Sequence, residues 1–211
     1  EALTERTGVP HTVFPTLTGL RANDDFILVL SALTGGRAPA TCQRQRSQLI
    51  DAMLDGHFSF SGKRVALASD PHLPYGLSTP SHGPGASIVC AVASTKNSPL
   101  LTQVPCETVV VGDLADLEEN AAGAGAELLV THSHGRMGAQ RLGVPLFRVG
   151  FPIFDRLGVQ HRCSVGYRGT RQLIYDIANV FLAQLHQKSP SDFADVLPPE
   201  PITLDTRHDY A

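Results

Sequence analysis

Two histidines lie two residues apart in the segment THSHGR, directly after an apolar run. His132 and His134, together with Ser133 and Arg136, could bind a metal ion or transfer protons. A zinc-type site needs at least three protein ligands, and no third ligand stands at a suitable spacing. The alternative is structural, with Thr131, Ser133 and the histidines capping the helix that follows. We expect this structural role for the strand-end patch formed by His132, Ser133, His134 and Arg136.

A second stretch, FRVGFPIFDR, combines glycine and proline with exposed-looking hydrophobic residues. Two aromatic residues in a proline-braced turn are typical of interface anchors. The acid and base that end the turn could hold a substrate, but adjacent residues cannot easily grip one ligand, and a structural ion pair is commoner. We therefore predict a contact loop made of Gly150, Phe151, Pro152, Ile153, Phe154, Asp155 and Arg156.

Other motifs that would indicate chemistry are absent from the sequence. No G-x-G-x-x-G or Walker lysine follows the first apolar run, which argues against a nucleotide site. No Ser-His-Asp or Cys-His arrangement can be assembled from sequence neighbours. The four cysteines are far apart and form no C-x-x-C pair; they are Cys42, Cys90, Cys106 and Cys163. We predict no catalytic, cofactor-binding or metal-binding residue in this chain alone, and reduced thiols in a cytoplasmic protein.

The bulk composition is that of an ordinary globular chain. It has 211 residues, 42% hydrophobic content and a formal net charge of −3, with its basic residues scattered along the sequence. This charge gives no general attraction for nucleic acid or acidic lipid. No apolar stretch approaches the roughly 20 residues that cross a bilayer. Because the sequence opens inside a helix-like stretch without an initiator Met, we expect a piece of a longer protein.

Five short apolar runs indicate the sheet that positions the two candidate sites. Each run is continuous rather than alternating, as in parallel strands buried on both faces. The gaps between the runs are long enough for crossover connections, and residues 113–124 form a clear crossover helix, with Leu114, Leu117 and Ala121 facing inward. The first crossover, residues 73–86, is rich in proline and glycine, so we expect a turn of helix there at most. The runs cover residues 64–69, 87–93, 108–112, 127–131 and 145–149.

The segments before and after the sheet in the sequence are predicted to form one strand and three helices. Residues 9–14 (VPHTVF) have the composition of a strand. The first helix has Asn23 as its N-cap, ends at Gly35 and carries an apolar stripe of Phe26, Val29, Leu30 and Leu33. The second helix starts at Thr41, ends at Gly56 and buries Leu49, Ile50, Met53 and Leu54. The last helix follows turns at Gly166 and Gly169, with a buried stripe of Leu173, Ile174, Ile177, Phe181 and Leu185.

These elements predict an α/β protein with a doubly wound, parallel, Rossmann-like sheet. A partial second lobe would be built from the N- and C-terminal helices. The expected division is the end of a preceding α/β domain (1–38), a bridging helix (39–61), the Rossmann-like domain (62–150), the contact loop with the final helix (151–187), and an extended tail (188–211).

Four long stretches resemble the C-terminal part of β-type subunits of the nitrogenase component 1 family. They are QRQRSQLIDAMLDGHF…GKRVALASDP, VGDLADLEE, HSHGR…RLGVPLFRVGFPIFDR and GYRGTRQLIYDIAN, and the resemblance covers about residues 1–187. It implies one Rossmann-like domain of a three-domain subunit. Within the family, the first and third stretches favour the branch that assembles the iron–molybdenum cofactor, whose members are non-catalytic scaffolds.

The resemblance also implies partners and cofactors for the parent complex. The partner would be a NifE-type subunit in an α2β2-like heterotetramer, with the nitrogenase iron protein and a NifB-type donor as further candidates. An iron–sulfur cluster and the iron–molybdenum cofactor precursor would belong to that complex. In the paired subunit a cysteine and a histidine hold the precursor. The loop that corresponds to that histidine is Gly150–Arg156 here, which contains no histidine or cysteine and is expected to make packing and subunit contacts.

Two other functions remain open at this point. One is the catalytic β subunit of nitrogenase, or of a related protochlorophyllide-reductase-like oxidoreductase. The other is a stand-alone flavodoxin-like module that binds a small ligand through the THSHGR segment.

Overall fold

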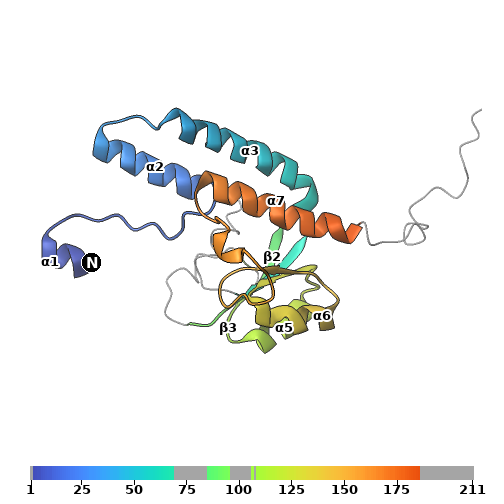
Figure 1. Cartoon of the computed structure of the whole chain (residues 1–211). Helices are drawn as coiled ribbons and strands as arrows, with labels where there is room; N and C mark the ends of the chain where they lie inside the picture. The colour runs from blue at the N-terminus through green and yellow to red at the C-terminus, as the bar shows by residue number, and fades with distance from the viewer. Residues whose placement is uncertain (1, 69–84, 96–105, 107, 186–211) are drawn as a thin grey trace, which may run out of the picture.

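The computed structural model describes residues 2–68, 85–95, 106 and 108–185, and its centre is one parallel sheet (Figure 1). Five strands lie in the order β3-β2-β1-β4-β5. Each falls inside one of the predicted apolar runs, which confirms the predicted α/β fold. The strands are β1 (Arg64–Ala68), β2 (Ser87–Ala93), β3 (Val109–Val111), β4 (Leu128–Thr131) and β5 (Leu146–Arg148).

The two faces of the sheet differ in side-chain size. On one face Ala66, Ala68 and Cys90 pack with Leu117 of helix α5 (Leu114–Gly123) and with helix α6 (Arg136–Leu142). The other face carries larger side chains, which pack with helices α3 (Ala40–Phe60) and α7 (Gly166–Leu185). Helices therefore cover both faces of the sheet, as a doubly wound arrangement requires.

Helix α7 buries the stripe that the sequence predicts. Leu173, Ile174, Ile177 and Phe181 are all buried, and the side chain of Leu185 lies outside the described residues. The helix begins at Gly166, so the turn predicted at Gly169 is wrong. A Cβ at Gly169 would lie 2.7 Å from the carbonyl carbon of Ser164. Close approach of the preceding loop explains this glycine.

Helix α3 does not end at Gly56, as the sequence predicts, but continues to Phe60. A Cβ at Gly56 would lie 2.7 Å from Cγ2 of Ile174. Glycine is therefore needed here because α3 and α7 approach closely, and not because the helix stops. The predicted buried face is also partly wrong, since Leu54 is exposed while Leu49 is fully buried.

Helix α2 (Leu20–Thr34) begins before Asn23, so that residue is not its N-cap. Asn23 lies inside the first turn, where its amide donates to the carbonyl of Leu17 over 3.1 Å and to that of Gly19 over 2.5 Å. The local reason is that Gly19 reaches a backbone conformation with φ 106° and takes the N-cap position without a side-chain hydrogen bond.

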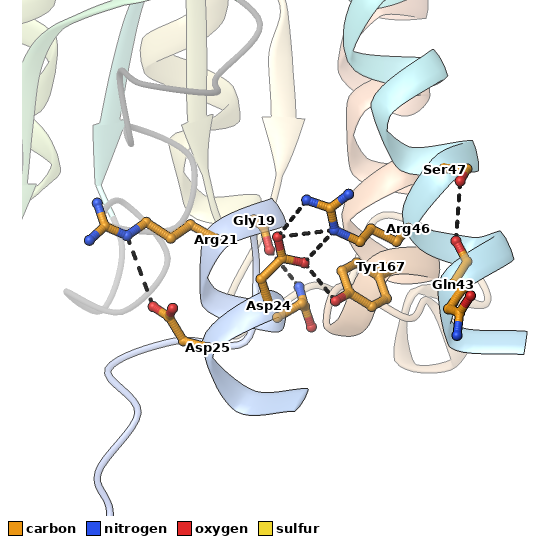
Figure 2. Close-up of polar contacts among 9 residues, drawn as sticks. Gly19, Arg21, Asp24, Asp25, Gln43, Arg46, Ser47 and Tyr167 are labelled. Atoms are coloured by element: carbon orange, nitrogen blue, oxygen red, sulfur yellow. Dashed lines mark hydrogen bonds and ion pairs between the residues drawn. The ribbon is translucent and has the colours of Figure 1, made fainter. Parts of the chain in front are cut away.

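A polar cluster attaches α2 to the two long helices. Figure 2 shows Asp24 between Arg46 of α3 and Tyr167 of α7. Arg46 grips Asp24 with two nitrogens, Nε to Oδ1 at 2.9 Å and Nη2 to Oδ2 at 2.8 Å. The hydroxyl of Tyr167 donates to Asp24 over 2.7 Å. Burial, and then the hydrogen bond to Asp24, raise the pKa of Tyr167, so it remains a neutral donor at physiological pH.

The strand predicted at residues 9–14 does not form. Val9 and Val13 are exposed, and the segment follows helix α1 (Ala2–Thr7), which has no buried residue. A strand needs a neighbouring strand for its hydrogen bonds, and none lies beside this segment among the described residues.

Two predicted segments cannot be compared with the structure. The proline-rich first crossover falls mainly on residues 69–84, and the tail falls within 186–211, both outside the described residues. Among the helices that the structure does describe, none is long and apolar enough to cross a membrane.

Candidate partner-contact site

The strand-end patch and the contact loop meet at one edge of the sheet. Strands β4 and β5 are parallel neighbours, with Thr131 paired to Arg148. The residues that follow each strand therefore lie side by side. After β4 the chain enters the short 3₁₀ helix η2 (Ser133–Gly135) and then α6, and after β5 it enters the contact loop.

Ser133 joins the two segments through three hydrogen bonds. Its amide donates to the carbonyl of Pro152 over 3.1 Å. Its hydroxyl accepts from the amide of Phe154 over 3.1 Å and donates to Oδ1 of Asp155 over 2.5 Å. The expectation that Ser133 caps the following helix is wrong, since neither η2 nor α6 has a side-chain cap hydrogen bond. The backbone and the carboxylate of the contact loop occupy this hydroxyl instead.

Arg148, at the end of β5, binds the carboxylate of Asp155 with two nitrogens. We call this ion pair, together with its hydrogen bond from Ser133, the brace. The Nε–Oδ1 distance is 2.7 Å and the Nη2–Oδ2 distance is 2.6 Å. The two side chains are only 11% and 13% exposed. The Arg148 guanidinium, with the Ser133 hydroxyl, holds the pKa of Asp155 well below its usual range, so the carboxylate stays charged at neutral pH.

The partner of Asp155 is therefore not the adjacent Arg156, which is exposed. Sequence reasoning missed Arg148 because the residue stands within the apolar segment PLFRVG, seven positions before its partner. A signal was nevertheless present. A basic residue inside a buried strand needs a nearby acid, and Asp155 is the first acid that follows.

The two histidines pack beside the brace. Their ring centroids are 5.4 Å apart, and the ring of His134 lies 5.2 Å from that of Phe154. Burial, and then the nearby His134, lower the pKa of His132, which favours a neutral imidazole. Within the described residues, no group of three or more His, Cys, Asp or Glu side chains could hold a metal ion. Nδ1 of His132 and the hydroxyl of Thr131 are buried without a hydrogen-bond partner in the same part of the chain.

The two aromatic residues of the contact loop are exposed, whereas Ile153 between them is half-buried. Phe151 is 86% exposed and Phe154 is 62% exposed. Leu157, one residue beyond the predicted loop, is fully exposed as well. Sequence reasoning did not include Leu157, although an apolar residue next to a glycine in an irregular segment is the same kind of signal. The loop thus combines a largely buried ion pair with exposed apolar side chains.

A small pocket adjoins the site between α5 and α6. Leu117, Glu118, His134 and Arg141 are among its lining residues, and its volume is about 120 Å³. Sites for small organic ligands usually measure about 300–1,000 Å³. This pocket therefore does not favour a module that binds a small ligand through the THSHGR segment.

Comparison with known proteins gives a consistent family. Residues 1–182 match the family model described as "Nitrogenase component 1 type Oxidoreductase". The chain is 54% identical over 184 residues to "Nitrogenase iron-molybdenum cofactor biosynthesis protein NifN" of Mesorhizobium japonicum, covering 87% of this chain and 40% of that protein. It is 48% identical over 190 residues to the NifN protein of Rhodobacter capsulatus, covering 90% and 41% respectively.

A solved structure shows the same fold. The structure described as "Nitrogenase Cp1 at pH 6.5" superposes with a TM-score of 0.82 at 32% sequence identity. The match covers 90% of this chain and 44% of that one. This chain therefore spans about two-fifths of the length of the curated relatives it matches.

Proposed function

Since this chain belongs to the nitrogenase component 1 type oxidoreductase family, we propose that it is part of a scaffold subunit on which the nitrogenase iron–molybdenum cofactor is assembled. Its identity with the named cofactor-biosynthesis proteins, 48–54% for the two described above, supports this function. Its identity with the nitrogenase structure is lower, at 32%. The comparison therefore favours an assembly scaffold over the catalytic β subunit.

The observation that carries the structural side of this proposal is the contact loop. The only acid of the loop, Asp155, is paired with Arg148, while the side chains of Phe151 and Phe154 are exposed to solvent. Exposed aromatic side chains on a well-fixed segment are typical anchors of protein interfaces. The partner in this proposal is a NifE-type subunit in an α2β2-like heterotetramer of the cytoplasm, with the nitrogenase iron protein and a NifB-type donor as further partners.

The family implies metal clusters, and the described residues do not fit one. Cysteine thiolates, commonly four, hold an iron–sulfur cluster. Cys42 lies on α3, Cys90 is buried in β2, and Cys106 and Cys163 lie in other segments. Burial raises the pKa of Cys90 to about 11, which disfavours the thiolate form. We therefore assign the iron–sulfur cluster and the cofactor precursor to other parts of the proposed complex.

The proposal is tested by replacing both aromatic anchors. The double variant Phe151→Ser/Phe154→Ser should lose most of its association with a co-expressed NifE-type subunit, because the exposed rings would be the main apolar contact. Association is measured by co-purification and by elution volume on a sizing column. The matched control is Phe58→Ser, which removes an 88% exposed aromatic residue from α3.

The fold of the double variant is checked separately by circular dichroism and thermal unfolding. We expect both to stay close to those of the parent chain because neither ring is buried. If the double variant co-purifies with the partner as fully as the control does, the contact loop is not the interface.

A further inference from the structure

The arginines are not evenly distributed along the sequence. Residues 131–171 contain seven arginines, no lysine and a single acid, Asp155. Seven positive charges against one negative charge leave this segment strongly basic, whereas the whole chain has a net charge of −3. The description of the basic residues as scattered is therefore wrong for the segment that contains both candidate sites.

Most of these arginines have identified partners, but two at the candidate site do not. Arg148 is paired with Asp155, and the other partnered arginines bind Glu118, Asp176 and Gln48. Arg136 and Arg156 are exposed, and neither has an ion pair or side-chain hydrogen bond among the described residues. Both belong to the segments that carry or contact the exposed rings. Arg136 follows η2, whose His134 contacts Phe154, and Arg156 follows Asp155 in the loop.

The exposed side chains of the loop and of the adjoining start of α6 thus combine apolar residues with arginines. We call this set the aromatic–arginine face and define it by Phe151, Phe154, Leu157, Arg136 and Arg156. The brace is the reason for its charge, because the single acid of the segment is already bound to Arg148. Arginine binds carboxylates with two parallel hydrogen bonds, which gives both attraction and orientation.

From this arrangement we infer that the surface that receives the aromatic–arginine face is apolar at its centre and carries Asp or Glu side chains opposite Arg136 and Arg156. The inference rests on the proposed function, since it specifies the chemistry of the partner subunit at the contact loop. Charges at the edge of an interface act mainly on the rate of association and on its salt dependence. Aromatic anchors at the centre act mainly on the rate of dissociation. The two groups of residues therefore have separate signatures.

The test measures association and dissociation rates with a purified NifE-type subunit on a sensor surface. The variant Arg136→Gln/Arg156→Gln should associate about tenfold more slowly at about 0.05 M salt, with dissociation unchanged, because two steering charges are lost. Its difference from the parent chain should largely disappear at about 0.5 M salt, where charges are screened within a few ångströms. The control is Arg44→Gln, which removes an exposed arginine from α3.

The variants separate failure of the inference from failure of the proposed function. If Phe151→Ser/Phe154→Ser weakens binding while the arginine variant keeps the parental association rate and salt dependence, the partner does not carry the inferred acids. If neither variant changes binding, the contact loop itself is not the interface.

The acids that pair with Arg136 and Arg156 could instead come from the chain's own C-terminal segment, because residues 189–211 contain five acids and one arginine. A shortened chain that ends at Lys188 tests this alternative. We expect the shortened chain to bind with the parental rate and salt dependence. If it binds faster and without salt dependence, the arginines serve the chain's own tail and the inference is overturned.

Discussion

Helices α2 and α7 both carry a periodic stripe of apolar residues, and the structure buries the stripe of α7 far more completely than that of α2. In α7 the predicted stripe faces the sheet, and Leu173 is 2% exposed. In α2 the residue that binds the two long helices is polar, because the carboxylate of Asp24 accepts hydrogen bonds from Arg46 of α3 and Tyr167 of α7.

Only part of the predicted stripe of α2 is covered, since Phe26 packs edge-on against Phe14. Leu30 and Leu33, further along the same stripe, are 40% and 76% exposed. Periodicity thus shows that a helix has an apolar face, but it does not show what covers that face.

The largest effect is expected when one leucine from each stripe is replaced by alanine. Leu173→Ala should lower the free energy of unfolding by about 3 kcal/mol, because it leaves a cavity between α7 and the sheet. Leu33→Ala should change it by less than about 0.5 kcal/mol, since the side chain is already in solvent. Chemical denaturation of both variants with unchanged m-values measures the two effects. Equal losses in the two variants would mean that Leu33 is buried against another part of the protein.

A second, smaller effect is expected where α3 approaches α7. Gly56→Ala should lower the free energy of unfolding by about 1–3 kcal/mol, because the new methyl group would collide with Ile174. Alanine favours helix by about 1 kcal/mol over glycine, so a net loss would show that packing dominates.

The matched control for this substitution is Gly123→Ala at the end of α5, where a Cβ would meet no atom within 4 Å. It should be neutral or stabilising when the thermal unfolding of both glycine variants is compared with that of the parent chain. A stabilising Gly56→Ala would contradict the close approach of the two long helices.

The smallest effect concerns the polar attachment of α2. Tyr167→Phe removes the donor to Asp24 and should lower the free energy of unfolding by about 1 kcal/mol, since Arg46 still binds the carboxylate. Tyr175→Phe on the same helix is the control, because that side chain is 36% exposed. If the two variants have the same unfolding midpoint, the hydroxyl of Tyr167 does not help to hold α2.

The sheet could be predicted from the sequence because every strand is a short, continuous apolar run between turn residues. The predictions were wrong where the role of a residue depends on contacts with residues far away in the sequence, or where a neighbouring residue takes the predicted role. Gly56 looked like a helix terminator, but its role depends on Ile174, more than a hundred residues later. Asn23 looked like an N-cap, but Gly19 takes that position. The segment at residues 9–14 has strand composition without a neighbouring strand among the described residues.

The candidate site was predicted as a set of residues but not as a geometry. Both the histidine patch and the contact loop were identified from their composition, and the parallel sheet brings them together. Neither the link through Ser133 nor the partner of Asp155 followed from sequence spacing. These contacts depend on the register of β4 against β5, which pairs Thr131 with Arg148.

The three hydrogen bonds of Ser133 have a consequence for the timing of recognition. They fix the backbone of the contact loop to the end of β4 at Pro152 and at Phe154. A flexible loop would lose conformational entropy when a partner orders it, and that loss weakens binding. Under the proposed function this ordering would take place once, when the domain folds, so the loop would be preorganised before it meets a partner.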